Sequence, residues 1–439
     1  MPSPELERVF TALKKYGYQS QSYNVVTGDK RYFFPATVPD AVVAYVVVSG
    51  VALVAGDPLC DERDIRDVCS EFLGFCQQNG WKCAFQAVTL RTLEALQFVG
   101  FGFIKIGEEP FFRLNDFSLD GGKFRDLRRD IRRAQADGMT IVEYLPNDHR
   151  DPAIELEMEE LSKAWAEKKG SGEFGFLVGN PEIADPGGRK YFLAMLNGHV
   201  EAFCVCTPIY ERNGIYFDLL RRKDRPVRGT VEFLIVDSFR QLKEQGYELV
   251  TLGTAPLSGE HADDPVQGWF IELAMDVAFH RLGYFYSFKP IYEFKEQFGP
   301  DFWESRYLAY HPARFNPVVI YALLKAYDPA AVRNLSQKQL VAAWDGIVSL
   351  AGTPVDLAEW VAHLPAETAH GITGLISHVP KPGMPTIPGL PKLTRLPGIE
   401  RLMETPHALN RLRQMAGFGG TGGNETGPEH PSDGSGTKS

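Results

Sequence analysis

The chain has 439 residues, 44% of them apolar, which suits two globular domains and an appendage. Its formal net charge of −10 excludes a protein that coats nucleic acid over its whole surface, because such proteins are basic. The N-terminal residues show no apolar segment of a secretory signal, and the longest apolar run, residues 41–56, is too short to span a bilayer. We therefore expect a cytoplasmic protein.

Residues 1–120 predict a first unit of alternating strands and helices. β-Branched and aromatic residues indicate strands at 32–34, 42–48 and 51–55. Helices are expected over 61–78 and, after a cap at Thr89, up to about Gly100, with a strand at 82–88 between them. The segment 103–114 is expected to complete the unit as a hairpin.

Residues 121–138 predict a basic helix that links two units. Apolar side chains recur at helical spacing on one face: Phe124, Leu127, Ile131 and Ala134. Cations fill most other positions: Lys123, Arg125, Arg128, Arg129, Arg132 and Arg133. This pattern is typical of a solvated face partly paired with neighbouring acids, or of a helix that faces phosphate groups.

Residues 139–312 repeat the order of strands, helix and strand. A strand to Tyr144, a helix at 152–169, a glycine-rich segment to about 188 and three strands precede a helix at 230–246 and a strand at 247–257. We predict a duplicated α/β fold with mixed sheets. A helical extension at 313–379 and a Pro/Gly-rich, largely disordered tail at 380–439 are expected to follow.

The cysteines form no C-x-x-C pair and have no histidines at a metal-binding spacing. They are Cys60, Cys69, Cys76, Cys83, Cys204 and Cys206. This usage predicts buried, reduced thiols, and we expect no metal and no cofactor.

The segment 216–239 carries the clearest chemical signal. A strand with Asp218 leads into a basic loop, and a helix begins near Gly229 and Thr230. Such a turn places backbone N–H groups and the positive end of a helix beneath an anion. It resembles the acyl-CoA-binding turn of the GNAT acetyltransferases, although it has only one glycine of that pattern. A solvated loop is the other interpretation.

Seven segments in order resemble a narrower family. They include "VSGVALVAGDPLC", "RDLRRDIRRAQADGMTI", "YFDLLRR", "LVTLGTAPLSG" and "FKEQFGPDFWESRYLAY". Over roughly residues 20–310 they resemble the catalytic portion of the phosphatidylglycerol lysyltransferases. The resemblance implies a tandem GNAT-like fold that transfers an aminoacyl group from aminoacyl-tRNA to a lipid hydroxyl without a metal. It also implies peripheral contact with the inner face of the membrane.

The resemblance assigns the catalytic pair to Asp218 and Arg221, which match the family's Asp-x-x-Arg motif. Lys169 and Glu173 match a second catalytic pair, but they are four residues apart where the family has three, so Lys168 is an alternative. Substrate-binding roles are expected for Arg222, Arg225, Arg228, Gly229, Thr254, Ser258, Lys295, Arg128 and Arg132.

Three points stay open from the sequence. Arg306 fits a structural ion pair as well as a substrate contact. The chain fits an acetyl-CoA-dependent GNAT acetyltransferase as a second function. A catalytically silent module that binds lipid or tRNA is a third function.

Overall fold

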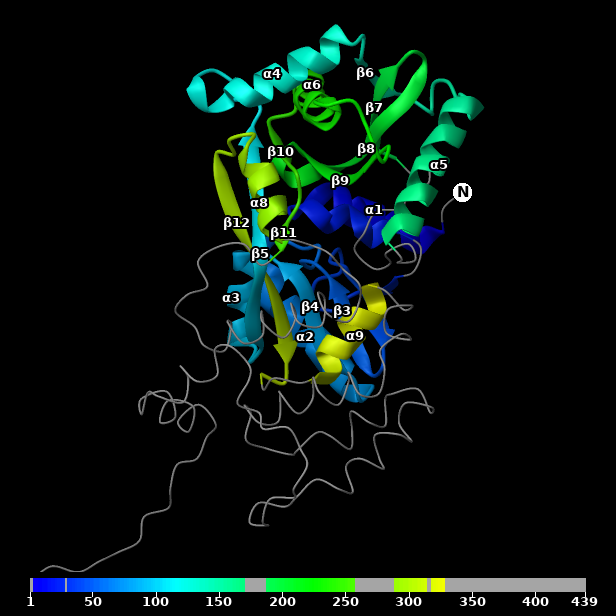
Figure 1. Ribbon diagram of the computed structural model, residues 1–439. Coiled ribbons are helices and arrows are strands. Elements are labelled where there is room, and N and C mark those ends of the chain that lie inside the picture. Colours follow the sequence, from blue (N-terminus) through cyan, green and yellow to red (C-terminus); the bar gives the residue numbers. More distant parts are fainter. Residues whose placement is uncertain (1–2, 28–29, 170–186, 257–287, 314–316, 328–439) are drawn as a thin grey trace, which may run out of the picture. The chain divides into compact units, whose positions relative to one another are not determined.

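The computed structural model describes residues 3–27, 30–169, 187–256, 288–313 and 317–327, all within one compact unit of the chain. These residues form a mixed sheet with helices on both faces, which confirms the predicted α/β class (Figure 1). The order of the strands is β1-β2-β3-β4-β12-β5-β10-β9-β8-β7-β6, and β11 pairs with β5.

The elements up to residue 113 are α1 (Pro4–Tyr16), η1 (Ser20–Val26), β1 (Arg31–Phe33), β2 (Val43–Val48), β3 (Val51–Ala55), α2 (Ile65–Gln78), β4 (Lys82–Val88), α3 (Leu90–Phe98) and β5 (Gly102–Arg113). Those that follow are α4 (Arg125–Ala136), β6 (Thr140–Tyr144), α5 (Pro152–Lys169), β7 (Lys190–Leu196), β8 (His199–Ile209), β9 (Gly214–Arg222), α6 (Thr230–Glu244), β10 (Leu249–Thr251), β11 (Ala255–Pro256), α8 (Phe288–Glu296), β12 (Phe302–His311) and α9 (Pro317–Tyr327).

The sheet contains the same arrangement twice, as the sequence predicted. In the first repeat, α2 connects the parallel pair β3 and β4, and α3 leads to the long strand β5. In the second repeat, α6 connects the parallel pair β9 and β10, and α8 leads to the long strand β12. Helical crossovers are the usual connection between parallel strands.

The two repeats exchange their last strands. β12 lies between β4 and β5, and β5 pairs with β10 of the second repeat. Residues 302–311, which the sequence placed with the second unit, are therefore hydrogen-bonded on both sides to strands of the first. This exchange joins both repeats into one continuous sheet (Figure 1).

The hairpin predicted over 103–114 is wrong, because β5 is one continuous strand. Its register with β12 shifts near Gly107, where Arg306 pairs with Gly107 and Tyr307 with Lys105. Ile106 between them is the extra residue of a β-bulge, which bends a strand without ending it. A sequence read locally cannot show that a distant strand pairs along the whole segment.

The predicted helices are otherwise confirmed where the structure describes them. α2, α3, α4 and α6 occupy the expected segments, and α9 matches the first helix expected after residue 312. Thr89 lies at the N-cap of α3, but its hydroxyl makes no capping bond and instead donates to Asp57 Oδ2 at 2.6 Å. The remaining extension and the tail from 380 lie outside the described residues.

The core of the second repeat lies beneath α4 and α6. α6 buries Leu234, Phe239 and Leu242, and α4 buries the apolar face that its sequence predicted. Each such side chain stabilises the fold by about 1.5–3 kcal/mol relative to an exposed position. Both helices therefore pack on the face of the sheet to which Ile215 and Phe217 of β9 point.

Substitution of Gly229 by alanine should destabilise the protein strongly. Gly229 has φ of +89° and a Cβ there would collide with the carbonyl oxygen of Asp130 on α4. Gly246 is the matched control, since it has φ of +88° but no atom within 4 Å of the added Cβ. Backbone strain should cost each variant about 1–3 kcal/mol, and the collision should cost Gly229→Ala about 1–3 kcal/mol more. Equal losses in urea unfolding would contradict this packing.

Candidate functional site

Asp218 is the extra residue of a β-bulge in β9. Phe217 and Leu219 pair with consecutive residues of β8, so the ladder passes over Asp218. A bulge shifts the alternation of side chains along a strand by one residue. Ile215 and Phe217 accordingly pack in the core beneath α6, whereas Leu219 packs in the core beside α5.

Arg221 lies on the α5 side of the sheet. Its guanidinium carbon is 3.7 Å from the ring centroid of Trp165 on α5, and the residue is 9% exposed. Residues three apart in a regular strand face opposite sides. Because of the bulge, Arg221 shares its side with Tyr216, and the charge of Asp218 helps to raise the pKa of the Tyr216 hydroxyl. The bulge at Asp218 therefore decides to which side of the sheet Arg221 points.

The turn between β9 and α6 is covered by α4. The carbonyl oxygen of Asp130 lies against Gly229, and Asp130 Oδ1 is 3.0 Å from Nε of Arg228. Thr230 is buried, and its hydroxyl donates to the carbonyl of Val227 at 2.6 Å. The close approach at Gly229 is therefore made to α4. An acyl-CoA pyrophosphate at this turn would meet that helix.

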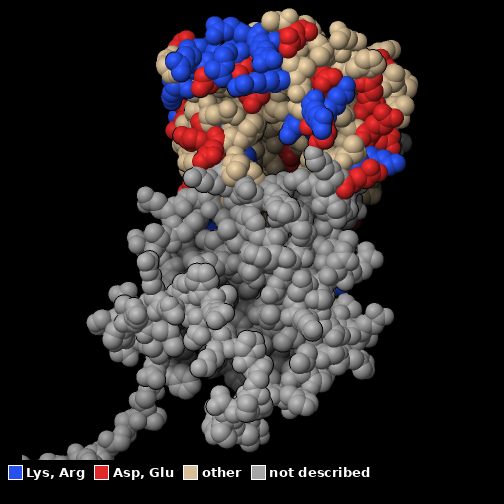
Figure 2. All heavy atoms as spheres, in the orientation of Figure 1, with Lys and Arg blue, Asp and Glu red and all other residues tan. Residues whose placement is uncertain are grey.

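Cations gather on the exposed face of α4 (Figures 1 and 2). Six exposed cations form what we call the basic surface: Lys123, Arg125, Arg129, Arg132, Arg133 and Arg228. Arg129 pairs with Asp126 at 2.8 Å, so part of its charge is compensated. Asp130 of α4 forms an ion pair with Arg228, so the basic helix and the basic loop after β9 lie next to each other.

The other predicted arginines have different surroundings. Arg225 and Arg132 are exposed. Arg222 is exposed too, and its Nη1 donates to the carbonyls of Lys223 and Asp224 at 3.3 and 3.4 Å. Arg128 is half-buried, and its Nη1 donates to the carbonyls of Leu119 and, at 2.9 Å, Gly121. Arg128 therefore fixes the chain entering α4.

Lys295 on α8 holds the loop after β10. Its Nζ donates to the carbonyls of Gly253 at 2.7 Å and Thr254 at 2.9 Å. Burial lowers the pKa of Lys295 to about 7, although the charge of Glu109 acts in the opposite direction. This amine therefore loses its proton far more readily than an exposed lysine does. Thr254 is half-buried, and Lys295 holds it through its backbone carbonyl.

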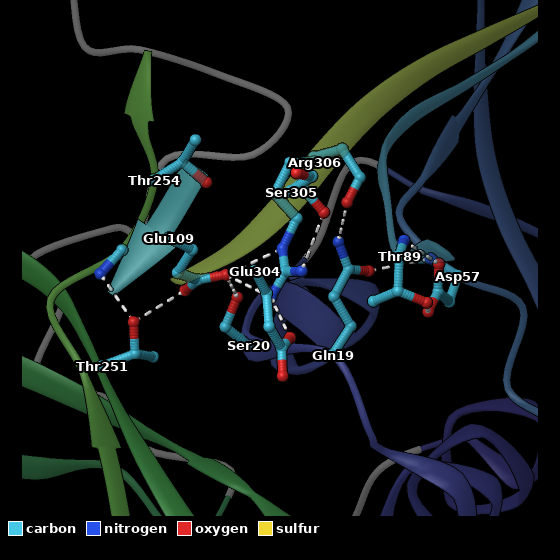
Figure 3. A network of polar contacts seen from close by, with 12 residues as sticks. Gln19, Ser20, Asp57, Thr89, Glu109, Thr251, Thr254, Glu304, Ser305 and Arg306 are labelled. Carbon is cyan, nitrogen blue, oxygen red and sulfur yellow. Dashed lines mark hydrogen bonds and ion pairs between the residues drawn. The ribbon is translucent and has the colours of Figure 1, made fainter. Parts of the chain in front are cut away.

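A buried network that the sequence did not reveal centres on Glu109 of β5 (Figure 3). Its Oε2 accepts from Ser20 Oγ at 2.9 Å and from Arg306 Nε at 2.8 Å, and its Oε1 accepts from Thr251 Oγ1 at 2.9 Å. Glu109 is 0% exposed and Arg306 1%. The ion-pair interpretation of Arg306 is confirmed. The partners come from η1, β10 and β12, which no local motif connects.

Several predicted residues cannot be placed in the site. Lys169 is the last residue of α5, and Glu173 and Ser258 lie outside the described residues.

All six cysteines are buried free thiols, as predicted, and burial raises the pKa of Cys60 to about 12. Among the described residues, no three or more His, Cys, Asp or Glu side chains are grouped to hold a metal. None of the described helices has the length and apolar character to cross a bilayer.

Comparison with known proteins supports the family resemblance. Residues 10–310 match the family model described as phosphatidylglycerol lysyltransferase, C-terminal. The phosphatidylglycerol lysyltransferase of Bacillus subtilis is 28% identical over 322 residues, 73% of this chain and 36% of that protein. The lysylphosphatidylglycerol biosynthesis bifunctional protein LysX of Mycobacterium avium is 26% identical over 317 residues, 70% of this chain and 26% of that protein.

A solved structure shares the fold. The structure of L-PGS from Bacillus licheniformis matches with a TM-score of 0.62 and 26% identity, over 74% of this chain and 97% of that one. The chain therefore spans about a third or less of the length of the relatives above, while it covers nearly all of the solved domain.

Glu109→Ala should destabilise the protein by about 3–5 kcal/mol, because it leaves the buried Arg306 without its closest carboxylate. Glu244→Ala is the matched control. Glu244 also pairs with an arginine, Arg240, at 2.7 Å, but its side chain is 62% exposed. That loss should stay below about 1 kcal/mol. Urea unfolding measures the free energy of unfolding of both variants. Similar losses of stability in the two would contradict a stabilising role for the network.

Lys295 should make stability rise with pH. Between about pH 7 and its ordinary pKa of 10.5, Lys295 is neutral in the folded protein but protonated in the unfolded chain. The unfolded state then binds more protons, so the free energy of unfolding increases with pH, by up to about 1.4 kcal/mol per pH unit. Lys295→Met should flatten this rise between pH 7 and 9. Parallel curves for parent and variant would show that Lys295 does not titrate there.

Proposed function

Because the chain belongs to the family described as phosphatidylglycerol lysyltransferase, C-terminal, we propose that it is a tRNA-dependent aminoacyltransferase. It moves an aminoacyl group, lysyl or similar, from tRNA to a hydroxyl of a lipid such as phosphatidylglycerol. The observation that supports the proposal is the bulge at Asp218 in β9, which turns Arg221 toward Trp165 of α5. Two charged groups of opposite sign thus flank this bulge, in the segment that matches the family's motif.

The reaction exchanges one ester for another. The oxygen of the lipid hydroxyl forms a bond to the carbonyl carbon of the aminoacyl group, and the bond from that carbon to the ribose oxygen of tRNA breaks. The proton of the lipid hydroxyl ends on the ribose oxygen. Since the donor ester is already activated, no ATP is required, and the protein must orient the groups and stabilise the developing oxyanion.

The pair supplies complementary groups for this step. Asp218 is an acceptor that binds the α-ammonium group of the donor or orients the attacking hydroxyl. Arg221 is a fixed cation, because stacking on Trp165 restrains its guanidinium. It fits a phosphate of the tRNA end or the oxygen that gains negative charge.

The basic surface suits the tRNA donor. The chain carries a net charge of −10, so a polyanion is held only where cations gather. α4 presents such a face, and Asp130 links it to the loop that follows the strand of Asp218. Acetyl-CoA is the weaker donor candidate, since α4 covers the turn that would hold its pyrophosphate.

The alanine variants Asp218→Ala and Arg221→Ala should each reduce transfer about 10²–10³-fold, because each removes an oriented charge from the transition state. The assay incubates the protein with radiolabelled aminoacyl-tRNA and phosphatidylglycerol vesicles and measures label in the extracted lipid. Glu244→Ala serves as a control, since its carboxylate is exposed on α6. Thermal melting should stay unchanged in all three.

Two outcomes of this assay would contradict the proposal. If the parent protein labels lipid from acetyl-CoA and not from any aminoacyl-tRNA, the donor is wrong. If the parent labels lipid but both alanine variants keep its full rate, Asp218 and Arg221 are not part of the site.

Charge reversal on the basic surface should weaken tRNA binding and reduce its salt dependence. We expect log Kd to change with log salt by roughly 0.7 per contacted phosphate. Arg132→Glu with Arg133→Glu should flatten this slope and leave the rate at saturating tRNA nearly unchanged. Lys14→Glu, at an exposed lysine of α1, is the control. Equal binding of parent and double variant at every salt concentration would make α4 a solvated face only.

A further inference from the structure

Arg221 differs from the other arginines of the basic segment that begins at the end of β9. It is buried, at 9% exposure, whereas the arginines that follow it up to residue 228 are exposed. Its cross-strand partner on β8 is Phe203, which is buried in the apolar cluster to which α5 contributes Met158. Residues directly opposite each other in an antiparallel pair point to the same side of the sheet. The side chain of Arg221 therefore extends toward α5.

The strand sets this direction but does not fix the guanidinium, because an arginine side chain has several rotatable bonds. Trp165 of α5 supplies a restraint. The guanidinium carbon lies 3.7 Å from the centroid of the tryptophan ring, and a cation and an aromatic ring attract each other within about 6 Å. Nη1 of Arg221 also donates to the carbonyl of Leu220 at 3.1 Å. Tryptophan gives the strongest such attraction, and removal from water increases it.

The tryptophan ring is itself held by a helix that is anchored on the sheet. α5 packs on both β8 and β9. Met158 of this helix is 2% exposed, and Oε2 of Glu157 accepts from the backbone N–H of Val200 at 2.7 Å. Trp165 follows Met158 by seven residues, about two helical turns, so both lie on the face that packs on the sheet. The position of the ring therefore follows from the packing of the helix.

We propose that Trp165 is a positioning residue of the transfer site: its ring holds the guanidinium of Arg221 in the orientation that meets an anionic oxygen of the substrate. The inference rests on the proposed transfer function, in which Arg221 contacts a phosphate of the tRNA end or the oxygen that gains negative charge. Groups at a reacting centre must keep their productive geometry within about 0.5 Å. Without the ring, the guanidinium would hold that geometry for only part of the time, and the rate would fall with that fraction.

Trp165→Leu should lower the transfer rate at saturating aminoacyl-tRNA and phosphatidylglycerol vesicles about 5- to 30-fold, the range expected for a desolvated contact between a cation and a ring. Trp165→Phe keeps a ring and should show an intermediate rate. Phe34→Leu is the matched control, because the ring centroid of Phe34 lies 3.8 Å from the guanidinium carbon of Arg8 on α1. It removes the same kind of contact in the first repeat and should keep the rate of the parent.

The double variant of Trp165→Leu and Arg221→Ala gives a second, independent readout. Because the ring acts only through the guanidinium, Trp165→Leu should cause no further loss of rate in the Arg221→Ala background. A role of Trp165 in packing alone would slow both backgrounds by the same factor. Thermal melting of every variant is measured alongside and should match that of the parent.

The outcomes separate the inference from the function beneath it. If the parent labels lipid but Trp165→Leu keeps its rate, or if the two losses multiply in the double variant, the positioning role is overturned while the transfer function stands. A full rate of Arg221→Ala overturns the positioning role as well. If the parent labels no lipid, the transfer function fails and the inference fails with it.

Trp165→Phe decides if Trp165→Leu melts early. A full rate of Trp165→Phe then overturns the positioning role. A lower rate with unchanged melting, which disappears as a separate loss in the Arg221→Ala background, supports it.

Discussion

The buried ion pair between Glu109 and Arg306 is the contact on which the joined sheet depends. Both charges are removed from water, which is unfavourable unless hydrogen bonds satisfy the remaining polar atoms. Here Ser20 of η1 and Thr251 of β10 provide those bonds. The pair stands where β5 and β12 exchange between the repeats, so it favours that one pairing of the strands over others.

The candidate site inherits its geometry from this arrangement. β10 pairs with β5 on one edge and with β9 on the other, so the exchanged strands fix the position of β9. Thr251 bonds both Glu109 and the backbone N–H of Gly253, and the loop at Gly253 presses on Tyr216. A continuous path of contacts therefore leads from the buried ion pair to the bulge that carries Asp218.

Much of the fold follows from local sequence, because helical spacing and β-branched runs report which faces are buried. The duplication and most helices are predictable in this way, and the Asp-x-x-Arg motif points to the right strand. The predicted hairpin is wrong because the strand only bulges at Ile106 and because β12 pairs with it from nearly 200 residues away, as the pair Arg306 and Gly107 shows. Glu109 gave no signal, since its partners on η1, β10 and β12 come together only through the strand exchange.

The central claim is that Asp218 and Arg221 act as one site at the bulge of β9. A double-mutant cycle on the transfer rate tests it most directly, with Asp218→Ala, Arg221→Ala and the double variant measured under the same saturating conditions. Residues that act as a unit lose their effects non-additively. We predict that the double variant is about as slow as the slower single variant. Losses that multiply in the double variant would show that the two residues act independently and would contradict the account.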